Sequence, residues 1–144
     1  MIKIICVGKI KEKFYRDAIL EYMKRLGKYH NVKIIEVMDS NINKEKDLIL
    51  KYINKKDYIT ILDIEGRELS SVEMADFIDK TLIVNSNLTF IIGGSFGIHE
   101  DIKKLSNYRL SFSKMTFPHQ LFRVIFLEQL YRSFKIINNE TYHK

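Results

Sequence analysis

Short apolar segments alternate with segments of helical periodicity along the 144-residue chain. The apolar segments are rich in Ile and Val, which favours buried strands. Strands that alternate with helices need crossover connections, and such connections produce a mostly parallel sheet with helices on both faces. We therefore expect a single α/β domain over residues 1–144, built on a sheet of about five strands. The predicted strands are 3–7, 32–38, 58–62, 88–92 and 109–113, and the predicted helices are 11–27, 43–54, 71–84, 98–106 and 118–137.

The composition limits the class of protein further. Hydrophobic residues make up 46% of the chain, which is enough for a substantial core and excludes disorder. The single cysteine, Cys6, excludes an intramolecular disulfide and a multi-cysteine zinc site. The histidines lack metal-site spacing, so we predict no metal. The longest uncharged stretch, 81–99, contains asparagines and glycines that make it a poor membrane span, and we expect a cytoplasmic protein.

Ligands of parallel sheets bind beyond the carboxyl ends of the strands, so three loops form the candidate binding region. The first follows Leu62, where residues 63–66 have the composition of a polar turn. The second begins at Gly93, where the sequence GGSFG lets backbone approach a ligand closely and allows positive φ. Its spacing is neither the dinucleotide fingerprint nor a P-loop, and an ordinary tight turn is the alternative. The third loop follows Ser113.

The net charge of +6 is concentrated at one end of the chain. Acidic and basic side chains balance over the first 102 residues, so the whole excess lies in residues 103–144. A basic region on an otherwise balanced domain indicates an anionic partner, RNA or DNA first. A solvated basic face without a partner is the alternative.

The last predicted helix, 118–137, carries apolar residues on every side. Such a helix must be covered all round, and one sheet covers only one side. We expect the remaining face to pack against an identical subunit in a two-fold dimer; the alternative is a fully buried central helix. Arg123 and Arg132 are nine residues apart and therefore point to opposite sides, one toward its own subunit's site and one toward a neighbour's. His119 shares the face of Arg123.

The polar tail ends in an aromatic ring, an imidazole and a cation, supplied by Tyr142, His143 and Lys144. Together these groups can stack on a base and hold a phosphate, whereas a frayed terminus is the alternative. Alternatives also exist on the last helix: an exposed pair with Glu128 for Arg132, and a surface position for the imidazole at residue 119.

Four sequence blocks carry a resemblance to a known family. They are 93–98, 110–120, 128–136 and 142–144, and the segment SKMTFPH at 113–119 together with the terminal YHK is the most specific part. The chain resembles, over essentially its whole length, the ribosomal RNA large subunit methyltransferase H family. Its members are bacterial SPOUT-class enzymes that methylate N3 of a pseudouridine in helix 69 of 23S rRNA. The stretch between Val37 and Tyr58 is shorter than is usual in that family.

The resemblance implies a C-terminal trefoil knot, a pocket for S-adenosyl-L-methionine, a homodimer through the last helix and action on assembled ribosomes. It implies RNA rather than DNA as the partner, and no membrane. The implied cofactor-binding residues are Leu62, Gly93, Phe112, Ser113, Lys114, Met115, Thr116 and Phe117. The implied catalytic residues are His119, Arg123, Arg132, Tyr142, His143 and Lys144.

The proton on N3 of the substrate must leave during methylation, and two routes are open. Either histidine of the catalytic set, His119 or His143, can serve as a general base. Alternatively, cations such as Arg123, Arg132 and Lys144 can stabilise the imide anion. A non-catalytic basic α/β module that binds RNA or the ribosome is the competing function.

Overall fold

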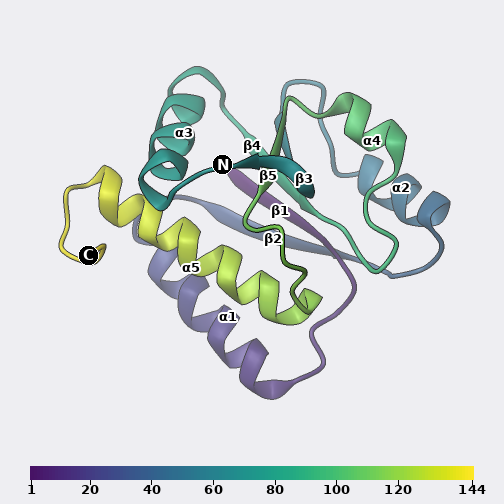
Figure 1. Ribbon diagram of the computed structural model, residues 1–144, viewed down its shortest axis with the longest axis horizontal. Coiled ribbons are helices and arrows are strands. Elements are labelled where there is room, and N and C mark those ends of the chain that lie inside the picture. Colours follow the sequence, from purple (N-terminus) through teal and green to yellow (C-terminus); the bar gives the residue numbers. More distant parts are fainter.

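Five parallel strands form one sheet in the order β2-β1-β4-β3-β5 in the computed structural model, which describes residues 1–144 (Figure 1). The expectation of an α/β fold with a parallel five-stranded sheet is confirmed. The strands are β1 (Ile2–Val7), β2 (Val32–Val37), β3 (Tyr58–Glu68), β4 (Leu88–Ile92) and β5 (Tyr108–Ser111), and the helices are α1 (Lys13–Leu26), α2 (Ile42–Leu50), α3 (Ser71–Val84), α4 (Glu100–Leu105) and α5 (His119–Ile137).

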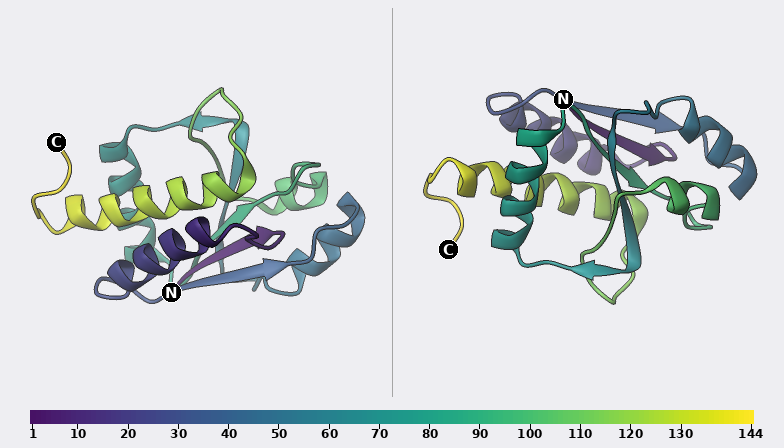
Figure 2. Two further views of the ribbon diagram at one scale, coloured as in Figure 1. Left: turned by 90° about the horizontal axis from the view of Figure 1, so that it is seen from below. Right: turned by 90° about the horizontal axis from the view of Figure 1, so that it is seen from above.

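The side chains of β1 show how the sheet builds two cores. Ile4 and Cys6 point into the larger cluster, which contains residues of α1, α3 and α5, whereas Ile5 and Val7 point into the cluster beneath α2 and α4. Helices therefore cover both faces, as predicted, and Figure 2 shows the two layers from opposite sides. Burial raises the pKa of Cys6 to about 12, so this thiol stays protonated as a core side chain.

Helix α3 begins at Ser71, directly after its N-cap residue Ser70. The hydroxyl oxygen of Ser70 accepts a hydrogen bond from the backbone N–H of Glu73 at 3.1 Å, and the Glu73 carboxylate accepts from the Ser70 N–H at 2.8 Å. This reciprocal pair is a capping box, and it satisfies two donors that the helix leaves free.

The prediction that the third strand ends at Leu62 is wrong, because β3 continues to Glu68. Both Leu62 and Arg67 are in register with Leu110 of β5, so residues 63–66 bulge out between two paired segments. Gly66 makes the bulge possible: a Cβ there would lie 2.7 Å from the backbone of Arg109. The polar composition of 63–66 is typical of a turn, but long-range pairing with β5 keeps the backbone extended.

Helix α5 lies between α1 and α3 on one face of the sheet (Figures 1 and 2). Its inner residues, among them Phe126 and Leu130, are fully buried. Its outer face keeps half-buried apolar residues such as Leu121 and Ile125. The flanking helices α1 and α3 thus cover more of α5 than the sheet alone would. One apolar stripe of α5 still faces away from the sheet and these helices. No helix in the structure is both long enough and apolar enough to cross a membrane.

Candidate active site

A cavity of about 500 Å³ lies between the bulge of β3 and the carboxyl ends of β4 and β5. This volume is within the usual range of small-molecule sites. The wall comes from the three loops that the sequence singles out, and it includes seven of the eight residues expected to bind the cofactor. Those seven are Leu62, Gly93, Phe112, Ser113, Met115, Thr116 and Phe117, whereas Lys114 is exposed and outside the wall.

The glycine-rich turn after β4 brings two backbone segments unusually close together. A Cβ on Gly93 would lie 2.8 Å from the carbonyl oxygen of Gly97, closer than real Cβ contacts. Gly97 has a φ of +74°, a conformation that other residues rarely adopt. Glycine therefore suits both positions, and both glycines line the cavity.

Asp63 supplies the cavity with a polar group that sequence reasoning missed. Its Oδ1 accepts a hydrogen bond from the Glu65 N–H at 3.1 Å, but its Oδ2 is buried with no partner. This oxygen is covered by protein and is out of reach of a ligand, whereas other atoms of the residue line the cavity. The sequence signal was present, because residue 63 directly follows the predicted strand end.

The loop after β5 is shaped by its own hydrogen bonds and by aromatic packing. The Ser111 hydroxyl donates to the Ser113 carbonyl at 3.0 Å, and the Ser113 hydroxyl accepts from the Met115 N–H at 3.0 Å. The ring of Phe122 on α5 packs against Phe112 and Phe117, with centroid separations of 5.1 and 6.0 Å. The start of α5 therefore holds this loop against the cavity.

The structure separates the expected catalytic residues into three places. His119 lines the cavity at the start of α5. Arg123 is buried outside the cavity wall, where it forms an ion pair with Glu36 and donates to the Gly8 carbonyl at 3.1 Å. It does not line the cavity, because its guanidinium is used to hold β2 and the end of β1 against α5.

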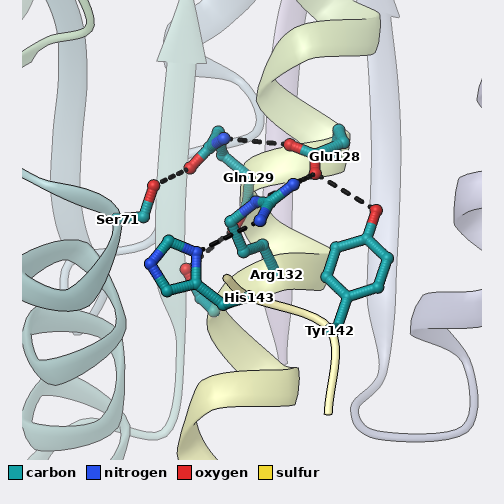
Figure 3. A network of polar contacts seen from close by, with 7 residues as sticks. Ser71, Glu128, Gln129, Arg132, Tyr142 and His143 are labelled. Atoms are coloured by element: carbon teal, nitrogen blue, oxygen red, sulfur yellow. Dashed lines mark hydrogen bonds and ion pairs between the residues drawn. The ribbon is translucent and has the colours of Figure 1, made fainter.

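The third place is a cluster at the far end of α5 (Figure 3). The Glu128 carboxylate accepts from Arg132 Nε and Nη2 at 3.0 and 2.6 Å, and from the Tyr142 hydroxyl at 3.2 Å. The pair of Arg132 with Glu128, given above as the alternative for this residue, is present but is partly buried rather than exposed, and its hydrogen bond raises the pKa of Arg132. The guanidinium also lies over the Tyr142 ring, 4.8 Å from its centroid.

The tail is folded back rather than frayed. Glu140 accepts from the Tyr29 hydroxyl at 2.9 Å and from Lys135 Nζ at 2.8 Å, which fixes the turn that follows α5. His143 Nδ1 lies 3.1 Å from Arg132 Nη1. The last residue, Lys144, is exposed.

One chain does not bring this cluster to its own cavity. Thirteen residues of one helix separate His119 from Arg132, which corresponds to about 20 Å along the axis. The two arginines point to different sides of α5, as predicted: Arg123 is buried, and Arg132 lies on the outer face.

Comparison with known proteins gives the class of this fold and cavity. Residues 1–143 match the family described as "Predicted SPOUT methyltransferase". Among solved structures, a probable methylase family protein from Haemophilus influenzae Rd KW20 aligns with a TM-score of 0.57 at 11% identity, over 99% of this chain and 70% of that one. The SpoU methyltransferase AviRb from Streptomyces viridochromogenes aligns with a TM-score of 0.51 at 14% identity, over 98% and 62%. At these identities the solved structures establish the fold, and the family match establishes a SPOUT methyltransferase.

A curated relative narrows the class. Ribosomal RNA large subunit methyltransferase H of Clostridium botulinum strain 657 is 51% identical over 157 aligned residues, which cover 99% of each chain. This chain belongs to the ribosomal RNA large subunit methyltransferase H family, and S-adenosyl-L-methionine is its methyl donor. The alignment is longer than the 144-residue chain, so the relative carries residues that are absent here.

Proposed function

We propose that this chain transfers a methyl group to N3 of a pseudouridine in helix 69 of 23S rRNA, in assembled ribosomes of the cytoplasm. The observation that carries the proposal is the cavity, which unites Leu62, Gly93 and the loop 112–117 at the strand ends. The sequence blocks around this cavity and at the terminus are those through which the chain resembles the family. The relative's name states an activity on large-subunit ribosomal RNA.

The residues of the cavity have distinct physical roles in holding the methyl donor. S-adenosyl-L-methionine supplies an electrophilic methyl group on a sulfonium. Leu62, Phe112 and Phe117 provide apolar surface for the adenine, and Gly93 lets backbone approach the ribose or methionine part. Asp63 adds a polar residue to the same wall. Orientation of this kind contributes up to roughly 7–11 kcal/mol to a two-reactant step.

The complete site requires two subunits. The outer face of α5 presents the half-buried Leu121 and Ile125 next to Glu128 and Arg132, which suits packing against a second copy of the helix. A two-fold dimer would place Arg132 and the tail of one subunit beside the cavity of the other. This arrangement accounts for the separation of His119 from Arg132 within one chain.

The C-terminal trefoil knot belongs to the same proposal. Residues 112–118 lead from β5 to α5 and form one wall of the cavity. The two paired segments of β3 hold β5 on both sides of the bulge at Gly66. A threaded segment at this place would keep the cavity wall fixed to the sheet without help from the cofactor.

A methylation assay tests the function. The protein is incubated with S-adenosyl-L-methionine carrying a labelled methyl group and with ribosomes that lack the modification, and the 23S rRNA is then mapped by mass spectrometry. Incorporation at one pseudouridine of helix 69, far faster in ribosomes than in naked 23S rRNA, is the expected result. Binding to ribosomes without measurable affinity for the methyl donor would instead favour the non-catalytic module.

Variants of the tail cluster provide the second arm of this test. Arg132→Ala, and a chain that lacks residues 142–144, should both lose methylation while they keep the cavity and its cofactor affinity. Arg25→Ala is the matched control, because Arg25 forms the same type of helical pair with Glu21 at 3.1 Å on α1. Full activity in both tail variants would refute the assignment of the tail to the site.

A further inference from the structure

Both carboxylate oxygens of Glu128 accept hydrogen bonds at the far end of α5. One carboxylate oxygen serves Arg132 and the Tyr142 hydroxyl, and the other accepts from Gln129 Nε2 at 2.9 Å. Gln129 in turn accepts from the Ser71 hydroxyl at 2.7 Å, so the network reaches α3 (Figure 3). A guanidinium held by a carboxylate that is itself fixed to a second helix has little freedom to turn.

The contact between Arg132 and His143 determines where the imidazole carries its proton. A guanidinium has only donors and keeps its charge in proteins. Because Nη1 of Arg132 lies 3.1 Å from Nδ1 of His143, that ring nitrogen must be the acceptor. The neutral ring then has its proton on Nε2, and a doubly protonated ring would lose this hydrogen bond.

We propose that Glu128 is a positioning residue that, through Arg132, holds His143 as the Nε2–H tautomer, so that His143 acts as a hydrogen-bond donor to the substrate and not as its base. The proposal rests on the proposed methylation. The N3 proton then leaves to solvent water, and the imide anion accepts the Nε2–H bond. The N3 electron pair forms the new bond to the methyl carbon while the carbon–sulfur bond breaks and leaves its pair on sulfur.

Two substitutions at position 143 separate a donor from a base. The amide N–H of His143→Gln can replace the Nε2–H donor but cannot take up a proton, whereas His143→Ala removes both possibilities. We expect single-turnover methylation of ribosomes by His143→Ala to fall by about 10²–10³-fold, the loss that follows removal of one oxyanion donor, and His143→Gln to recover most of that loss. Equal loss in both folded variants would overturn the donor role.

Nuclear magnetic resonance of ¹⁵N-histidine-labelled protein tests the tautomer without any methylation. A proton on Nε2 and an unprotonated, hydrogen-bonded Nδ1 are expected for His143 in the wild-type chain, and a proton on Nδ1 would overturn the proposal. Glu128→Ala should shift the Nδ1 resonance toward that of free imidazole and lower kcat, with affinity for the methyl donor unchanged. Glu21→Ala, which breaks the matching pair on α1, should change neither.

The methylation assay and the histidine spectrum together test this inference separately from the proposed function. If the wild-type chain fails to methylate ribosomes, the proposed function fails, while the spectrum still decides the tautomer. If wild-type methylation succeeds and Glu128→Ala leaves both kcat and the His143 spectrum unchanged, the positioning role is refuted and the function stands.

Discussion

Replacing Gly93 by alanine tests whether the cofactor cavity depends on close approach of two backbone segments. The added Cβ would lie 2.8 Å from the Gly97 carbonyl oxygen, whereas ordinary contact begins at 3.4 Å. The turn must therefore open by about 0.6 Å, and overpacking of this kind costs about 1–3 kcal/mol. Because Gly97 and Ile98 form part of the cavity wall, we expect that cost to weaken binding of the methyl donor by about 5- to 150-fold.

Calorimetric titration with S-adenosyl-L-methionine measures this loss, and urea unfolding establishes that the variant is folded. Gly27→Ala is the matched control, since Gly27 has a helical φ of −59° and its added Cβ would meet the nearest carbonyl oxygen at 3.5 Å. The control should bind as the wild type does. A folded Gly93→Ala chain that binds the methyl donor with unchanged affinity would refute the reasoning.

Three further predictions concern stability. Lys3→Met leaves the buried Asp57 without its 2.6 Å ion-pair partner and should cost about 3–5 kcal/mol in urea unfolding at neutral pH; a loss below about 1 kcal/mol would contradict this. Burial raises the pKa of Asp57, but hydrogen bonds from Lys3, Asn54 and Thr89 lower it overall. The free energy of unfolding of the wild type should therefore have its full value above about pH 4 and decrease as acid protonates this carboxylate. Urea unfolding from pH 7 to pH 3 measures this decrease, which should be smaller in Lys3→Met. Ser70→Ala removes the cap of α3 and should lower the free energy of unfolding by about 1 kcal/mol without changing cofactor affinity.

The sequence was sufficient for the type and order of all ten elements, because their signals are local. Apolar runs rich in Ile and Val mark the strands, and helical periodicity marks the helices. The rule that ligands bind at strand ends then selected the loops at Leu62 and Gly93, and the cavity lies there. Helical geometry also placed Arg123 and Arg132 on opposite sides of α5.

What the sequence could not give depends on contacts between distant residues. The strand β3 continues beyond Leu62 because β5 pairs with it, and no local pattern in residues 63–66 predicts that pairing. The burial of Arg123 depends on Glu36, 87 residues earlier in the chain, and the folded-back tail depends on Tyr29, 111 residues before Glu140. Contacts between residues so far apart in the chain produce no periodic pattern in the sequence.

The central claim is that the cavity between the bulge of β3 and the carboxyl ends of β4 and β5 holds the methyl donor for a ribosomal substrate. Mass-spectrometric mapping of 23S rRNA, after ribosomes are treated with the wild-type chain or with Gly93→Ala, tests it most directly. The account predicts one new methyl group on a helix 69 pseudouridine with the wild-type chain, and much slower incorporation with the variant at limiting donor. Methylation at the same rate by both folded proteins, or none by the wild type, would contradict it.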